Sequence, residues 1–301
     1  MKKPKIALVW GVVGLLCLGG IYFIWRGTVQ KDPAHYYVPF DISMQLVHHP
    51  IKDWPINNWR SREIYSLFKT IYEKKSFKHA TFHAQTRVPM RIHQIWLGSP
   101  FPEKYRAFQE SWKKYHPDWE YYLWTDAELE KFNLYNRALY DASTNYGEKS
   151  DIARYEILHK MGGLYVDTDF ECLKPFDLFN HCYDFYIGIQ PLDTAYVQLG
   201  IGLIGATAGH PLLKQVIERM RGNAKNNKAI ITRTGPLYFT QVFCAVAPFL
   251  KGEVIAFPAT YFYPKSYAQK DDTTNVWVRP ESFAVHHWEA SWLKPEAFVK
   301  G

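Results

Sequence analysis

The first strong pattern along the chain is an apolar run near the N-terminus. Residues Ile6 to Trp25 carry no charge, and this run has about the length of a helix that crosses a bilayer. Lysines within the first five residues predict a cytoplasmic N-terminus by the positive-inside rule. The run is long for a cleaved signal peptide and lacks a small-x-small cleavage site. We therefore expect residues 1–28 to be a short tail and an uncleaved membrane anchor.

The next pattern is helical and follows a stretch without periodicity. From Gly27 to about Pro55 the chain contains prolines and no regular apolar spacing, which is typical of a linker. Between Arg60 and Lys78 apolar residues recur at i, i+3, i+4, i+7 and i+8, which predicts an amphipathic helix. These residues are Ile64, Leu67, Phe68, Ile71 and Tyr72. Residues 29–86 are thus expected to form a stem whose helix packs on the domain that follows.

From residue 87 onward, strand patterns and helix patterns alternate. This alternation predicts an α/β domain over residues 87–301, with a Rossmann-like, mostly parallel sheet flanked by helices. The expected strands begin at Arg91 and cover 120–124, 164–166, 170–175, 183–190 and 197–206. The expected helices cover 103–115, 127–142, 152–161, 212–221 and 237–247, the last with Thr234 as its N-cap.

The segment from Lys149 to Phe170 organises this domain. Ile152, Tyr155, Leu158 and Met161 recur at helical spacing and would form one buried stripe. Gly162 and Gly163 supply the positive-φ positions that end a helix, and the next three residues suit a short buried strand. Asp167 and Asp169 then come where the strand stops, at the edge where open α/β sheets bind ligands.

Alternate residues of an extended segment point the same way, so Asp167 and Asp169 can serve one cation. Hard oxygen ligands favour Mg²⁺ or Mn²⁺, which would offset charge on a diphosphate. On the preceding helix, Asp151 and Arg154 stand at i and i+3. They suit a carboxylate for sugar hydroxyls and a guanidinium for phosphate. The alternative is an exposed ion pair that contributes about 0.3–0.5 kcal/mol.

Two motifs in this segment resemble a known signature. Ser150-Asp151-x-x-Arg154-Tyr155 followed by Gly162-Gly163-x-Tyr165-x-Asp167-x-Asp169 resembles the sugar-transferase region of glycosyltransferase family 32. That family includes yeast mannosyltransferases and bacterial capsule enzymes. The resemblance implies a GT-A fold, a divalent cation, a nucleotide-diphospho-sugar donor and transfer with retention of configuration. GDP-mannose is the first choice of donor and a UDP-hexose the next, with a glycan or glycolipid as acceptor.

The resemblance extends to both sides of the signature. Residues 88–98 resemble the segment that opens the nucleotide-binding half, which implies that Trp96 lies against the base; without the family, core burial is the better interpretation. Residues 285–292 resemble the family's His…Ser-Trp element. His286 is the first choice for a third metal ligand, and Glu289 or Ser291 the next. Adjacent histidines point oppositely in a strand, so at most one faces the site. The predicted donor site also includes Tyr155 and Trp292.

Charge and cysteine content exclude other classes. The formal net charge is +7, and the basic residues are scattered, which suits anionic nucleotide-sugars or a membrane surface and not nucleic acid. The four cysteines contain no Cys-x-x-Cys metal pattern. If the source is eukaryotic, we expect a single-pass protein with its domain in the Golgi lumen. If it is bacterial, we expect the inner membrane.

Two other functions remain open at this point. Phosphohydrolases of the haloacid-dehalogenase type also place Asp-x-Asp after a strand, but they have Thr or Val where this chain has Glu171. Their motif follows the first strand, whereas Asp167 comes late in this chain. A membrane-anchored sugar-binding protein without turnover would explain the abundant aromatic residues, but it leaves the clustered acids unexplained.

Overall fold

The computed structural model describes residues 32–46, 59–192 and 196–289. The predicted anchor, Ile6 to Trp25, lies outside these residues. Within the described ranges, no helix combines the length and the apolar character needed to cross a bilayer.

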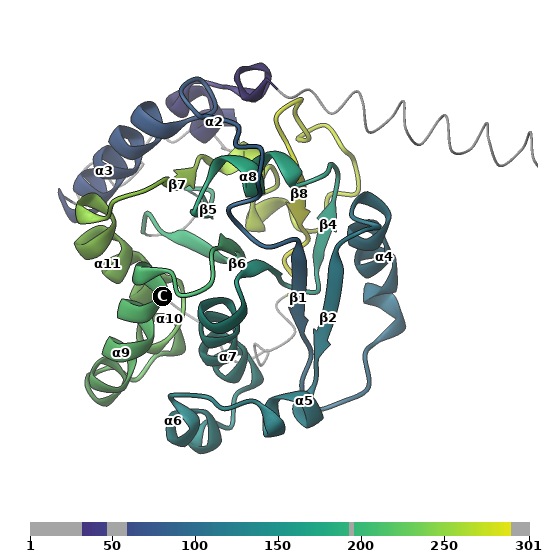
Figure 1. Cartoon of the computed structure of the whole chain (residues 1–301), viewed down its shortest axis with the longest axis vertical. Helices are drawn as coiled ribbons and strands as arrows, with labels where there is room; N and C mark the ends of the chain where they lie inside the picture. The colour runs from purple at the N-terminus through teal and green to yellow at the C-terminus, as the bar shows by residue number, and fades with distance from the viewer. Residues whose placement is uncertain (1–31, 47–58, 193–195, 290–301) are drawn as a thin grey trace, which may run out of the picture.

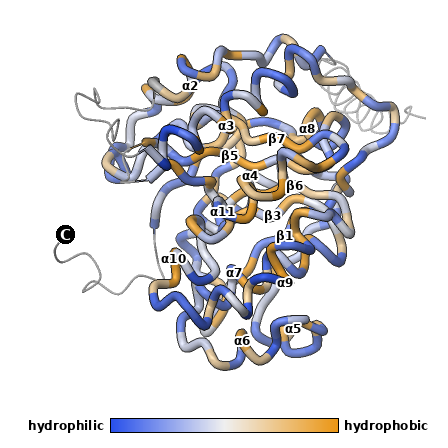
Figure 2. The backbone as a smooth tube through the Cα atoms, turned by 90° about the vertical axis from the view of Figure 1, so that its left-hand side faces the viewer, coloured by the Kyte–Doolittle hydropathy of each residue, from blue (hydrophilic) through white to orange (hydrophobic). Residues whose placement is uncertain are grey.

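A six-stranded sheet forms the centre of the molecule, in the order β2-β1-β3-β6-β5-β7 (Figure 1). The strands are β1 (Arg91–Ile95), β2 (Glu120–Trp124), β3 (Gly163–Val166), β5 (Phe185–Ile189), β6 (Leu199–Ala206) and β7 (Val254–Phe257). β6 runs antiparallel to both of its neighbours, and the other strands run parallel to one another. The predicted mostly parallel sheet is therefore confirmed. Figure 2 shows hydrophobic stretches of the chain along these central strands.

Helices cover the sheet. On one side α7 packs against α9, α9 packs against α11, and both α7 and α11 contact β6 (Figure 1). The α-helices are α2 (Phe40–Leu46), α3 (Trp59–Lys75), α4 (Arg106–Tyr115), α5 (Asp126–Lys131), α6 (Arg137–Ala142), α7 (Tyr146–Met161), α8 (Asp177–Cys182), α9 (Pro211–Asn226), α10 (Ile230–Arg233) and α11 (Pro236–Val246). Short 3-10 helices are η1 (Pro33–Tyr36), η2 (Glu103–Tyr105), η3 (Ala247–Phe249), η4 (Ala259–Tyr261) and η5 (Tyr267–Gln269).

The unit of α7, turn and β3 forms as the sequence predicts. Asn145 caps the helix by accepting a hydrogen bond from the amide of Glu148 at 3.1 Å. The helix ends at Gly162, whose φ is 64°, and Gly163 follows with a φ of 110°. A Cβ on Gly163 would lie 2.8 Å from the carbonyl oxygen of Arg91, so only glycine lets β3 approach β1 this closely.

A second, two-stranded sheet lies next to the acids. It pairs β4 (Phe170–Cys172) antiparallel with β8 (Ala284–His286), and Phe170 lies opposite His286. Helix α4 packs on β4, and the indole N–H of Trp112 donates to the carbonyl of Phe170 at 2.8 Å. This pairing brings the C-terminal segment to the end of β3.

The N-terminal part of the described chain differs from the predicted linker. Residues 33–36 and 40–46 are helical, and Phe40 and Met44 are buried in the common core. The hydroxyl of Ser43 also lies 2.5 Å from that of Thr260. The linker prediction is therefore wrong here, because helices this short show no periodicity. The amphipathic helix is confirmed, since α3 packs against β7.

Two further elements differ from the prediction. The single helix expected over residues 127–142 is two helices, α5 and α6, separated by a loop at residues 132–136. Thr234 is not the N-cap of α11, because Gly235 occupies that position. The hydroxyl of Thr234 instead donates to Asp151 at 3.1 Å.

Candidate active site

Three potential metal ligands meet where β3 ends. The side chains of Asp167, Asp169 and His286 each offer a ligand atom, and these atoms all lie within 4.8 Å of one another. Nε2 of His286 is 3.2 Å from Oδ1 of Asp169. The structure thus brings the two predicted acids together with the first choice for the third ligand.

Asp169 is held as a carboxylate. Its Oδ2 accepts the amide N–H of Glu289 at 3.0 Å, and its side chain is almost entirely buried. Burial by itself raises the pKa of Asp169, but the charge and hydrogen bond of His286 and the Glu289 amide outweigh it and leave the pKa below its ordinary value. The His286 ring is fixed in turn by Phe170 and Trp288, at centroid distances of 4.6 and 4.2 Å.

The neighbouring histidine points away from these acids. Nε2 of His287 lies 3.1 Å from Oε2 of Glu171, and its ring stacks on Phe108. The expectation that only one of the two adjacent histidines faces the acids is therefore confirmed. Glu171 and His287 form a second acid–imidazole pair, separate from that of Asp169 and His286.

Arg154 links the helix to the first acid. Its Nη2 lies 3.1 Å from Oδ1 of Asp151, and its Nη1 lies 3.1 Å from Oδ1 of Asp167. It also donates to the carbonyl oxygens of Ser150 and Ile201, at 3.2 and 2.9 Å. Both side chains of the Asp151–Arg154 pair are buried, at 8% and 6% exposure, so the alternative of an exposed ion pair is wrong.

These contacts change the role expected for Arg154. The guanidinium is buried, and protein oxygens surround it on several sides. It is therefore placed to orient Asp167 and to neutralise the two carboxylates. The direct phosphate contact predicted for Arg154 would require some of these partners to be replaced.

Asp151 is enclosed as well. It accepts the Thr234 hydroxyl, and burial raises its pKa to about 7 against the lowering effect of Arg154 and Thr234. Tyr155 is fully buried, stacks on Phe239 and donates its hydroxyl to the carbonyl of Thr234 at 2.8 Å. This corrects the prediction that Tyr155 contacts the donor, because both its ring and its hydroxyl are enclosed by protein.

Comparison with known proteins bears on this constellation. Residues 102–186 match the family model described as "Glycosyltransferase sugar-binding region containing DXD motif". This part of the chain is therefore similar to a DXD sugar-binding region. The predicted resemblance is confirmed, and Asp167 and Asp169 are its DXD acids.

Curated proteins and a solved structure are similar to parts of this chain. The chain is 31% identical over 178 residues to "Inositol phosphoceramide mannosyltransferase 3" of Schizosaccharomyces pombe, covering 56% of this chain and 49% of the relative. It is 32% identical over 108 residues to "Initiation-specific alpha-1,6-mannosyltransferase" of Saccharomyces cerevisiae, covering 32% of this chain and 22% of the relative. The chain thus spans about half the length of the first curated relative. The solved structure of "PaToxG Glycosyltransferase" is 19% identical, with a TM-score of 0.47 and coverage of 64% and 79%.

Trp96 lies at the same sheet edge as the DXD acids, since β1 and β3 are parallel. It is partly buried, its ring centroid lies 5.2 Å from that of Tyr105, and its indole N–H donates to the Ser99 hydroxyl at 3.0 Å. Its contact with the base stays a prediction. Gly98 follows with a φ of 79°, and a Cβ there would lie 2.2 Å from the Tyr146 ring. The amide of Gly98 donates to Asp126 at 2.7 Å, which ties the ends of β1 and β2 together.

The remaining predicted C-terminal ligands are less well placed. The Glu289 carboxylate is exposed and pairs with Lys104 at 2.5 Å. This corrects its assignment as a metal ligand, because only its backbone amide reaches Asp169. Ser291 and Trp292 lie outside the described residues, so their roles stay predictions.

The sequence interpretation missed two tyrosines beside the DXD acids. The Tyr165 hydroxyl donates to Oδ1 of Asp167 at 2.6 Å. Its position two residues before Asp167 in an extended segment could have indicated this shared direction. Tyr263 is fully buried near both acids. No local pattern points to Tyr263, because it comes from a distant loop.

Proposed function

We propose that the protein is a metal-dependent, retaining glycosyltransferase that transfers a hexose from a nucleotide-diphospho-sugar. GDP-mannose is the first choice of donor, UDP-glucose or UDP-galactose the next, and the acceptor is a glycan or glycolipid. The observation that carries the proposal is the meeting of Asp167, Asp169 and His286 at the end of β3. The curated relatives named above are mannosyltransferases, which supports the choice of sugar.

The residues present suit a divalent cation. Two carboxylates and one imidazole form a donor set that Mn²⁺ accepts well, and the carboxylates also suit Mg²⁺. Asp169 and His286 are already in contact, and the ring of His286 is fixed by its aromatic neighbours. When bound, the cation would offset the charge that develops on the leaving diphosphate.

The chain's own residues would position the reacting groups. Arg154 and Tyr165 hold the Asp167 carboxylate from two sides, so its direction is set before any ligand binds. Trp96 stands at the same edge and is proposed to lie against the base. We propose front-face attack by an acceptor hydroxyl, because no side chain stands out as a covalent nucleophile.

Hydrolysis of nucleotide-sugars tests the proposal without knowledge of the acceptor. The full chain would be assayed with GDP-mannose, UDP-glucose, UDP-galactose and a phosphomonoester, in Mn²⁺, in Mg²⁺ and in chelator. We expect chelator-sensitive cleavage of a nucleotide-sugar and none of the phosphomonoester. Cleavage of the phosphomonoester alone would favour the haloacid-dehalogenase alternative, and no cleavage would favour a sugar-binding protein.

The two histidines provide a matched pair of variants. His286→Ala should lower kcat/KM for the donor by about 10²-fold or more, equivalent to about 2.7 kcal/mol. His287→Ala, which removes an imidazole from the same strand end, should stay within about threefold, well under 1 kcal/mol. Equal effects of the two substitutions would contradict the assignment of His286.

We also propose that Ile6–Trp25 anchors the protein in a membrane, as a single-pass protein of the Golgi or the bacterial inner membrane according to its source. The apolar run and its basic flank support this. Removing residues 1–28 should release an active domain from the membrane fraction. Recovery of the full chain in the soluble fraction would contradict the anchor.

A further inference from the structure

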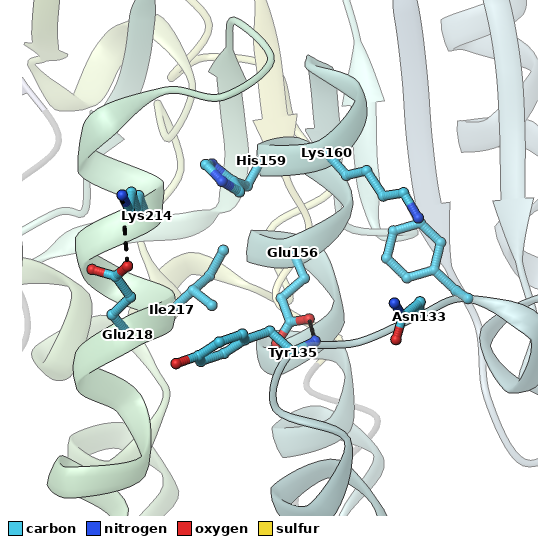
Figure 3. Close-up of a pocket in the computed structure, with 9 residues that line it drawn as sticks. Asn133, Tyr135, Glu156, His159, Lys160, Lys214, Ile217 and Glu218 are labelled. Carbon is cyan, nitrogen blue, oxygen red and sulfur yellow. Dashed lines mark hydrogen bonds and ion pairs between the residues drawn. The ribbon is translucent and has the colours of Figure 1, made fainter.

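A cavity of about 420 Å³ opens beside α7, away from the DXD acids. It lies between α7, α9 and the loop that joins α5 to α6 (Figure 3). His159, which lines it, comes eight residues after Asp151 on the same helix, a separation of about 12 Å along the helix axis. The cavity therefore contacts α7 through Glu156, His159 and Lys160, nearer the C-terminal end of the helix than Asp151 and Arg154.

The loop at residues 132–136 is fixed by side chains from both helices. The buried carboxylate of Glu156 accepts the backbone amide of Tyr135 (Figure 3) and also that of Asn136, the latter at 2.9 Å. Arg221 of α9 donates to the carbonyl oxygen of Tyr135 and, at 3.1 Å, to the side-chain oxygen of Asn136. The path of this loop thus depends on backbone contacts, and not on the Tyr135 side chain.

This fixed loop presents a large aromatic ring to solvent. Tyr135 is 57% exposed although the backbone on both sides of it is anchored. The guanidinium of Arg221 lies 4.9 Å from the ring centroid. A tyrosine held in this way offers a flat apolar surface at little cost in conformational entropy, which is the property of a binding platform.

Hydrogen-bonding groups of both kinds surround the ring. Within the described ranges, the Asn133 amide makes no hydrogen bond, so it offers a free donor and a free acceptor. Lys214 and Glu218 face each other at 3.8 Å across one turn of α9 and remain exposed. His159 also lines the cavity.

We propose that this cavity binds a neutral carbohydrate, as a second sugar site separate from the DXD acids. A pyranose has a row of C–H groups that suits an aromatic face and hydroxyls that both donate and accept, which matches the ring and the mixed polar groups. Lys214 and Glu218 would serve neighbouring hydroxyls on one side of the cavity, and Asn133 lies on the other side (Figure 3). The site goes beyond the proposed transfer: it would hold part of a glycan while another part is at the DXD acids.

A phosphate fits this cavity less well. Lys160 and Lys214 would attract an anion, but Glu218 and Glu156 also line the cavity. Lys160 is directed toward the Phe132 ring, 4.7 Å from its centroid. A neutral ligand is not repelled by the glutamates, and its hydroxyls can hydrogen-bond to both the donors and the acceptors that line the cavity.

Titration calorimetry with the full chain tests the site, using methyl α-mannoside and an α-linked mannotriose as probes and inorganic phosphate as competitor. We expect sugar binding that Tyr135→Ala weakens by at least about tenfold, equivalent to about 1.4 kcal/mol. Tyr135→Phe keeps the ring and should stay within about threefold of the wild type. Donor hydrolysis should be the same in all three proteins, since Tyr135 does not approach the DXD acids.

Asn133→Ala is a second variant that keeps the ring, and it should also weaken sugar binding. The proposal is overturned if the wild type binds neither sugar, if Tyr135→Ala binds them with the wild-type constant, or if inorganic phosphate displaces them. Its failure is distinguishable from failure of the proposed function, because binding and donor hydrolysis are measured separately. Melting temperatures of Tyr135→Ala, Tyr135→Phe and Asn133→Ala confirm that each variant is folded.

Discussion

Polar residues near the DXD acids and polar residues around the cavity differ in how far they are buried. Toward the DXD acids, Asp151 and Arg154 are buried and their charged groups are matched by protein partners. Toward the cavity, Lys214 and Tyr135 stand beside the same helix largely exposed. The first arrangement fixes geometry and contributes to stability, whereas the second leaves groups available to a ligand. Substitutions near the DXD acids should therefore change turnover and stability, whereas a substitution at the exposed cavity wall should change neither.

The largest expected effect is on turnover, from substitution of a DXD acid. Asp169→Asn should abolish transfer with little change in melting temperature, because it removes a carboxylate where the leaving diphosphate needs a cation. Donor hydrolysis at saturating Mn²⁺ measures this, with an expected loss of at least about 10²-fold. Glu171→Gln alters the neighbouring acid–imidazole pair and serves as the control. Near-wild-type activity of Asp169→Asn would remove the metal assignment.

The next effect is on stability. Arg154→Met leaves the buried Asp151 and the partly exposed Asp167 without their counter-charge, so the free energy of unfolding should fall by about 3–5 kcal/mol. Arg106→Met is matched in residue type and spacing, since Arg106 pairs with Glu103 at i, i+3 on the surface. Its effect on the free energy of unfolding should be much smaller than that of Arg154→Met. Urea unfolding of both variants measures the difference. Similar losses would show that the buried Arg154 pair contributes no more to the free energy of unfolding than a surface pair.

A smaller effect is the pH dependence that Asp151 imposes. Its pKa is about 7 in the folded protein and 3.8 ordinarily, so between these values the folded state holds a proton that the unfolded state has lost. Stability from this group is present below about pH 4 and is lost as pH rises toward 7. Asp151→Asn removes the titration. The unfolding free energy of the wild type, relative to this variant, should fall across that range, and a constant or rising difference would contradict it.

The smallest effect is expected at the exposed end of the comparison. Lys214→Ala removes one member of an exposed i, i+4 pair, so the free energy of unfolding should change by under about 0.5 kcal/mol. Donor hydrolysis should be unaltered as well. A clear loss of stability would mean that the cavity wall is part of the core. It would also contradict the difference in burial between the cavity and the DXD acids.

Local patterns in the sequence were sufficient for the elements that carry the acids. The helical stripe, the glycine pair and the short strand predicted α7 and β3, and the acids stand where β3 ends. The choice of His286 rests on the resemblance of residues 285–292 to a family element, and strand geometry adds only that at most one of the two adjacent histidines faces the site. These inferences need only residues close together in the chain.

Burial of the polar face of α7 could not be predicted in this way. Every residue from Asp151 to Leu158 is buried, so this half of the helix has no exposed side on which a pair could be a surface pair. Spacing at i and i+3 is the same for a buried pair and an exposed one. The hydroxyl that donates to Asp151 belongs to Thr234, which is 83 positions away in the chain. The local pattern around Thr234 indicates a helix cap instead. Such contacts depend on tertiary packing.

The pairing of β4 with β8 also determines when during synthesis the site can exist. His286 is made 117 residues after Asp169, because 286 − 169 = 117. At about 5–20 residues per second, a ribosome needs roughly 6–23 s to cover that distance. A nascent chain that already carries both DXD acids therefore still lacks the imidazole and the strand that complete their surroundings. The proposed site therefore stays incomplete in the growing polypeptide until the segment that carries His286 has been made.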